Sequence, residues 1–151
     1  MIRLTDEATV TMHAHAREGY PHEVVGILAG EGASRRVTRV AALVNERADS
    51  AHNRYAVGPL ALQRAERALE AEGLSILGYY HSHPDHPAMY SEFDRDHAWP
   101  NLTYVIVSVV AGEVVDTRAW RLTEDRAAME HEVIGDATTD GRCRGEAAPD
   151  R

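Results

Sequence analysis

Ser75-Ile76-Leu77-Gly78-Tyr79-Tyr80-His81-Ser82-His83-Pro84 is a largely apolar stretch that ends in two histidines and a proline. The apolar run predicts a buried strand from Ser75 to His81. Pro84 and Pro87 then predict a loop, because proline fixes φ and lacks an N–H. Side chains alternate along an extended backbone, so His81 and His83 point the same way. The stretch therefore presents two imidazoles side by side where a strand ends.

Ser91-Glu92-Phe93-Asp94 follows that loop, and Asp94 lies eleven residues after His83. A carboxylate returned to the two imidazoles gives a third ligand. Two His, one Asp and an open fourth position form the ligand set of a catalytic zinc site. Ser-x-x-Asp also resembles a helix capping box, with Ser91 capping a short helix through about Trp99. The two interpretations are compatible, since a capped helix fixes the rotamer of a ligand on it.

A zinc hydrolase also needs a base, and Glu23 is the candidate. It stands between a turn that contains Pro21 and the most apolar run of the chain, Val24 to Gly30. A carboxylate at the boundary of a core is costly, and desolvation makes it a stronger base. Non-ligand glutamates act as the base in other zinc hydrolases. On this argument alone, a solvated loop acid remains the alternative.

Capping residues and periodicity predict the remaining elements. Thr5 and Asp6 begin a helix that runs to Glu18, and Pro59 and Gly73 bracket a second helix over 60–72. Strands are expected over 2–4, 24–30, 35–45, 54–57, 102–110 and 114–122, and a further helix over 124–134. Residues 1–134 are expected to form one domain. Residues 135–151 lack periodicity, which predicts a disordered C-terminal tail.

The composition excludes several classes of protein. The chain has 151 residues, of which 44% are hydrophobic and 26% charged, as in ordinary globular domains. The net charge of −8 without a basic stripe argues against a nucleic-acid partner. No apolar run approaches the roughly 20 residues that span a bilayer, and the N-terminus does not resemble a secretory signal. A cytoplasmic protein with one cysteine, Cys143, and no internal disulfide is the expectation.

Other histidines and aromatic residues are weaker candidates. His13-Ala14-His15 lies in a predicted helix, where positions i and i+2 do not face each other, so it is not expected to form a site. A deaminase is disfavoured because the Pro-Cys-x-x-Cys half of that zinc motif is absent. Surface or supporting positions are expected for His86 and His97, a turn position for Asp85, and core positions for Trp99 and Trp120.

The order Glu23, His81-Ser82-His83-Pro84 and then Ser91-x-x-Asp94 resembles the motif of the JAMM (MPN+) zinc metalloproteases, Glu … His-Ser/Thr-His-x7-Ser-x-x-Asp. The segment from Pro21 to Gly30 is similar to the family's Glu-bearing segment, and the resemblance covers roughly Leu4 to Leu122. It implies an α+β fold of the cytidine deaminase-like kind. In that fold a curved mixed sheet forms a partial barrel flanked by helices.

The resemblance also implies roles for the residues of the motif. His81, His83 and Asp94 would bind zinc, and Glu23 would take a proton from the attacking water and return it to the leaving amine. Ser91 would hydrogen-bond the oxyanion. The family cleaves amide or isopeptide bonds after the C-terminal glycine of ubiquitin-like proteins. The insertions of eukaryotic members are missing, so this short chain resembles the bacterial branch that acts on ubiquitin-like sulfur carriers, in one case releasing cysteine.

The expected partner is therefore a ubiquitin-like or sulfur-carrier protein with a C-terminal Gly-Gly. Its extended tail is expected to lie against a sheet edge near the zinc, as in strand addition. Two alternatives stay open. One is a non-catalytic MPN-type binding module, although such relatives usually lack the ligands that this chain retains. The other is a zinc amidase or peptidase that acts on small peptide substrates.

Overall fold

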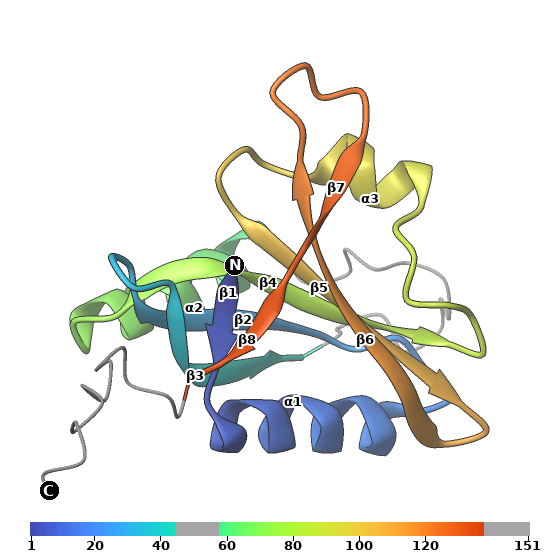
Figure 1. Cartoon of the computed structure of the whole chain (residues 1–151). Helices are drawn as coiled ribbons and strands as arrows, with labels where there is room; N and C mark the ends of the chain where they lie inside the picture. The colour runs from blue at the N-terminus through green and yellow to red at the C-terminus, as the bar shows by residue number, and fades with distance from the viewer. Residues whose placement is uncertain (45–57, 138–151) are drawn as a thin grey trace, which may run out of the picture.

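The structure is a computed structural model that describes residues 1–44 and 58–137 (Figure 1). Within these residues, strands and helices alternate along the first part of the chain and strands dominate the last part. The elements are β1 (Ile2–Leu4), α1 (Asp6–Gly19), β2 (Val25–Glu31), β3 (Arg36–Leu43), α2 (Pro59–Ala71), β4 (Ser75–Pro84), α3 (Glu92–His97), β5 (Thr103–Val110), β6 (Glu113–Leu122), β7 (Met129–Glu132) and β8 (Ile134–Asp136).

All of these strands form one mixed sheet in the order β7-β6-β5-β4-β2-β3-β1-β8. β7 and β8 stand at opposite ends of this order, yet only Val133 separates them in the chain. Figure 1 shows β7 continuing into β8, and the Ile2 N–H donates to the Val133 carbonyl at 3.0 Å. The sheet must therefore curl until its ends meet, which gives a nearly closed barrel. The predicted mixed sheet with flanking helices is confirmed.

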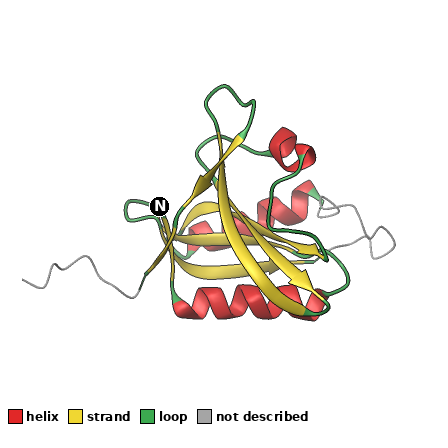
Figure 2. Cartoon of the chain, turned by 45° about the vertical axis from the view of Figure 1, so that its right-hand side comes forward, coloured by secondary structure: helices red, strands yellow, loops and turns green. Residues whose placement is uncertain are grey.

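Helices cover the sheet on both sides (Figure 2). Thr5 caps α1, accepting from the Ala8 N–H at 3.1 Å, and α1 buries Ala8, Met12 and Ala16. These side chains belong to the main core cluster, together with residues from β1 to β6. α2 buries Leu69 against Ile27 and Ala29 of β2 in a separate cluster. β4, at the centre of the sheet, is thus packed from both faces, which gives its end a rigid position.

The predicted helix over 124–134 is wrong. Thr123 and Asp125 instead close a turn, in which the Asp125 carboxylate accepts from the Thr123 hydroxyl at 2.6 Å and from the Ala127 N–H at 3.0 Å. Short polar side chains that bond the nearby backbone favour turns over helices. The chain then pairs as β7 with β6, in the register Ala119 with Glu132. Pairing with β7 gives the backbone groups at the outer edge of β6 their hydrogen-bond partners, and this gain outweighs the helix propensity of the segment.

Two element ends also differ from the prediction. β4 extends past His81 to Pro84, because β5 pairs alongside it in parallel as far as Pro84 and Val109. Residues 135–137 do not begin a disordered tail, since Gly135 and Asp136 pair with β1 and Ala137 is buried. The predicted strand over 54–57 and the rest of the predicted tail lie outside the described residues. No helix of the described residues is long and apolar enough to cross a membrane.

Gly26 supports the central strands by leaving room for a tyrosine ring. A Cβ built on Gly26 would meet the Tyr80 ring at 2.1 Å, and Tyr80 is fully buried. We expect Gly26→Ala to lower the free energy of unfolding by about 2 kcal/mol through overpacking, measured by urea denaturation. Gly73→Ala is the control, because Gly73 has nothing within 4 Å and a φ of +84°. Its cost is expected to be about 1 kcal/mol, and equal losses in the two variants would contradict the steric argument.

Candidate metal centre and active site

The end of β4 carries His81 and His83 on the same side, and both are buried, with exposed fractions of 7% and 6%. Their Nε2 atoms lie 3.1 Å apart. Asp94 of α3 faces the same point, with its Oδ1 3.2 Å from Nε2 of His81 and its Oδ2 3.6 Å from Nε2 of His83. The structure thus brings together the three side chains that the sequence predicts as metal ligands.

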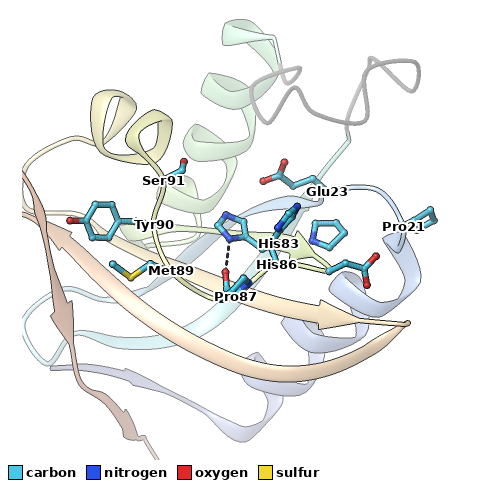
Figure 3. A pocket seen from close by; sticks show the side chains of 10 residues that line it. Pro21, Glu23, His83, His86, Pro87, Met89, Tyr90 and Ser91 are labelled. Atoms are coloured by element: carbon cyan, nitrogen blue, oxygen red, sulfur yellow. Dashed lines mark hydrogen bonds between the residues drawn. The ribbon is translucent and has the colours of Figure 1, made fainter.

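This donor set fits a zinc ion. Zinc bonds of about 2.0–2.2 Å in a tetrahedral array place neighbouring ligand atoms roughly 3.3–3.6 Å apart, close to the 3.1–3.6 Å separations found here. His83 is also held in the required tautomer. Its Nδ1 lies 2.8 Å from the Pro87 carbonyl oxygen (Figure 3). Because a carbonyl only accepts, Nδ1 carries the proton and Nε2 offers a lone pair.

Asp94 is fixed by the capping box that the sequence predicts. The Ser91 N–H donates to Asp94 Oδ2 at 2.8 Å, and the Asp94 N–H donates to Ser91 Oγ at 3.1 Å. Burial raises the pKa of the Asp94 carboxyl, but the adjacent imidazoles of His81 and His83 and the hydrogen bond from the Ser91 N–H outweigh burial and hold that pKa well below its usual range. The carboxylate is therefore charged and oriented at the positive end of α3. The capping interpretation of Ser-x-x-Asp is confirmed, and it is compatible with a ligand role for Asp94.

Glu23 also lies close to the imidazole pair, in the segment that enters β2. A carboxylate oxygen of Glu23 and one nitrogen each of His81 and His83 all lie within 4.8 Å of one another. Two carboxylates thus approach the same pair of imidazoles, that of Asp94 and that of Glu23. In Figure 3, Glu23 and Ser91 stand on either side of His83. This arrangement leaves Glu23 close to the centre as a proton acceptor.

Two hollows reach the imidazole pair, one at His83 and the other at His81. An open cavity of about 640 Å³ is lined by Glu23, His83 and Ser91. A second cavity of about 410 Å³ reaches His81 and has an aromatic lining that includes Tyr79, Trp99 and Tyr104. An extended substrate segment that passes from one hollow to the other would place one of its bonds next to His81 and His83.

The loop between β4 and α3 is held through its backbone, by Ser108 and Trp120, for which the sequence predicted no such role. The Ser108 hydroxyl donates to the His86 carbonyl at 2.6 Å, and Trp120 Nε1 donates to the Ala88 carbonyl at 3.1 Å. These bonds flank Pro87, whose carbonyl orients His83. No local pattern predicts them, because the partners are more than 20 residues apart in the chain.

The weaker candidates are also placed. His13 contacts Thr117 on β6 while His15 contacts Tyr80 on β4, so the two do not form a site, as predicted. His86 and His97 are exposed, also as predicted. Trp120 is 6% exposed and belongs to a core cluster, but the core position predicted for Trp99 is wrong, since Trp99 is 65% exposed. It lies in the loop between α3 and β5, where the described structure does not cover it.

The sequence model for prokaryotic homologs of the JAB domain matches residues 5–123. The chain belongs to this family. Two curated relatives of this JAB-domain protein are similar in sequence. The desampylase of Haloferax volcanii is 35% identical over 112 residues, which cover 71% of this chain and 80% of that protein. A probable TtuB-protein conjugate cleaving protease of Thermus thermophilus is 45% identical over 93 residues, which cover 62% of this chain and 60% of that protein.

Solved structures of other proteins have the same fold. The solution structure of a Desulfitobacterium hafniense protein has a TM-score of 0.74 and 31% identity, covering 90% of this chain and 94% of that one. A structure described as JAMM, a metalloprotease-like zinc site in the proteasome and signalosome, has a TM-score of 0.54 and 13% identity, covering 90% and 97%. At that identity the likeness shows the fold alone. Together these findings confirm the predicted JAMM (MPN+) resemblance, fold and metallopeptidase class.

The sheet-edge docking expected for a substrate tail stays a prediction, and β4 itself does not provide that edge. β4 is hydrogen-bonded to β2 on one side, where Val25 pairs with His81, and to β5 on the other, where His81 pairs with Ile106. Both neighbours are themselves paired further out in the sheet. The end of β4 therefore has no open edge beside His81, so a tail that pairs with the sheet would have to use another strand.

Proposed function

We propose that this JAB-family protein is a zinc-dependent peptidase or isopeptidase that cleaves an amide bond after the C-terminal glycine of a ubiquitin-like or sulfur-carrier protein. The observation that carries the proposal is the convergence of His81, His83 and Asp94 on one point, beside Glu23 and an open cavity. The names of the two relatives, a desampylase and a protease for TtuB conjugates, support this class of substrate.

His81 and His83 through Nε2 and Asp94 through its carboxylate are the residues that would hold the zinc. When bound, a zinc ion makes water acidic near neutral pH and polarises a carbonyl, while its fourth position stays open. The chain supplies the rigidity. β4 fixes the two imidazoles, the Pro87 carbonyl fixes the tautomer of His83, and the capping box fixes Asp94.

Glu23 is the proposed proton carrier. Its carboxylate takes one proton from the water that attacks the scissile carbonyl, so that a C–O bond forms and the carbonyl oxygen becomes an oxyanion. When the C–N bond breaks, Glu23 delivers that proton to the departing nitrogen, which leaves as a neutral amine. The Glu23 carboxylate is then restored, and the protons balance without another donor.

Ser91 is the proposed donor to the oxyanion, and it provides a test. Its Oγ accepts from the Asp94 N–H, which fixes where the hydroxyl stands in the wall of the cavity. We expect Ser91→Ala to lower kcat about 100-fold, as loss of one oxyanion donor does, and to cost about 1 kcal/mol of stability through the lost cap. Zinc content should stay at one per chain by elemental analysis. Ser91→Thr is the control, and a kcat equally low in that variant would contradict the role of the hydroxyl.

The glycine requirement has a physical reason at this site. His81 and His83 are 7% and 6% exposed, so a scissile carbonyl must come close to a recessed centre. Residues without side chains allow the backbone of the tail to make this approach. The hollow on the Trp99 side and the hollow on the Ser91 side offer room for the two halves of the substrate. A carrier that ends in Gly-Gly and is extended by an amine therefore suits the site.

The direct test is to incubate the zinc-loaded protein with ubiquitin-like carriers extended beyond Gly-Gly, and to follow them by intact mass. Linear peptide, lysine isopeptide and cysteine adducts of the same carrier separate the three kinds of bond. The proposal expects a product that ends at the last glycine, and expects none when Gly-Gly is replaced by Ala-Ala. Cleavage of small peptides only would favour a general zinc peptidase. Tight binding of a carrier without turnover would favour a non-catalytic module.

A further inference from the structure

Residues 20–24 form a short arch between α1 and β2, and Glu23 is its fourth residue. Both ends of this arch are fastened to the segment 82–85, which carries His83. Such an arrangement is unusual for a loop, because loops are generally the most mobile part of a fold. It bears on the proposed reaction, since the position of Glu23 relative to the imidazoles depends on the arch.

The first fastening lies at Val24. Its N–H donates to Ser82 Oγ at 2.9 Å, and the Ser82 N–H donates to the Val24 carbonyl at 3.1 Å. Ser82 is fully buried, and Val24 is 7% exposed. Ser82 stands between the two histidines and, by strand alternation, points to the opposite face of the sheet. Its hydroxyl therefore holds the residue after Glu23 without entering the metal centre.

The second fastening lies at Tyr20. Its hydroxyl donates to the Asp85 carboxylate, at 3.0 Å from Oδ1 and 2.8 Å from Oδ2. Asp85 is itself held, since its Oδ1 accepts from the Ala111 N–H at 3.1 Å and its own N–H donates to the Val109 carbonyl at 2.7 Å. The link therefore joins the start of the arch to the loop after β4 and to the β5–β6 turn.

We propose that Ser82 and the Tyr20–Asp85 pair are positioning residues that hold the Glu23 arch in register with the two imidazoles. In the arch, the two hydrogen-bonded residues Tyr20 and Val24 lie on either side of Glu23. In the segment 82–85, their partners Asp85 and Ser82 lie on either side of His83. Only a few residues and these hydrogen bonds therefore separate the Glu23 carboxylate from the His83 imidazole. A misplacement of about 1 Å at a catalytic group lowers turnover about 100-fold. The arch thus preorganises the proton acceptor, and this inference rests on the proposed hydrolytic function.

Kinetics of matched variants test the proposal. We expect Ser82→Ala to lower kcat about 100-fold and Tyr20→Phe or Asp85→Ala about 10-fold, with KM and zinc content unchanged. Ser82→Thr, which restores an acceptor, and Asp85→Asn, which keeps an oxygen for the Tyr20 hydroxyl, should recover kcat to within about threefold. Thr117→Val is the control, because it also removes a hydroxyl from a hydrogen bond, at 2.9 Å to His13 on α1. It should leave kcat and KM unchanged.

A second measurement needs no substrate. Hydrogen exchange at the Val24 amide should be slow in the wild type and at least tenfold faster in Ser82→Ala and Tyr20→Phe, but unchanged in Thr117→Val. Unchanged exchange in the two arch variants would overturn the proposal, and so would a kcat within twofold of wild type. A fall in zinc content together with kcat would overturn it too. An inactive wild type with the expected exchange pattern would instead count against the proposed hydrolysis, while the mechanical role of the arch would stand.

Discussion

Glu23→Gln is expected to abolish turnover while the protein keeps its metal and its fold. The amide has nearly the shape of the carboxylate but cannot accept the proton that the attacking water must lose. General acid–base groups contribute about 10²–10⁴-fold to rates, and in the proposed mechanism Glu23 serves both halves of the reaction. We therefore expect kcat to fall at least about 1,000-fold. The measurement is a single-turnover assay on a carrier extended beyond Gly-Gly, with zinc content determined on the same sample.

The matched control is Glu92→Gln. Glu92 is an exposed acid in the first turn of α3, directly after Ser91, so the same chemical change is made beside the site without touching the imidazoles. This variant should keep kcat to within about twofold. Near-normal activity of Glu23→Gln would remove Glu23 from the mechanism. A loss of zinc in Glu23→Gln would instead place Glu23 among the metal ligands, because its carboxylate lies close enough to the imidazole nitrogens to share an ion with them.

His83→Ala is expected to lose the metal. The substitution removes one of two buried imidazoles and leaves His81 and Asp94, too few donors for a tetrahedral site. Zinc per chain, measured by elemental analysis after dialysis, should fall from about one to near zero. The rise in Tm that zinc gives the wild type should vanish as well, because a ligand stabilises only the state that binds it.

His86→Ala controls for histidine content and for the loop. His86 lies three residues after His83 and is exposed, and the loop is held at this point through its backbone carbonyl rather than its ring. The His86→Ala variant should bind zinc as the wild type does. Full zinc occupancy in His83→Ala, with an unchanged circular dichroism spectrum, would contradict the assignment of the ligand set.

Local patterns in the sequence predicted the core of the site. His81 and His83 follow from strand alternation, and the Ser91–Asp94 capping box follows from its four-residue spacing. Glu23 could be located because it borders the most apolar run of the chain, which becomes β2. These features depend on residues close to one another in sequence, where backbone geometry alone determines which side chains meet.

Contacts between distant segments were not predictable. The bond between Tyr20 and Asp85 joins residues 65 positions apart, and that between Val24 and Ser82 spans 58. β7 replaced part of a predicted helix and β8 replaced the start of a predicted disordered tail, because the sheet had two strand edges to pair, a requirement set by the whole barrel rather than by residues 129–136. Trp99 was expected in the core from its residue type. Its loop instead leaves it exposed beside the hollow that reaches His81.

The most direct measurement is an anomalous difference map, recorded at the zinc absorption edge from crystals of the zinc-loaded protein. The account predicts one strong peak, about 2.0–2.2 Å from Nε2 of His81, from Nε2 of His83 and from a carboxylate oxygen of Asp94, with Glu23 facing the ion but outside bonding distance. A peak bonded to other side chains, or an active enzyme with no peak between these three residues, would contradict it.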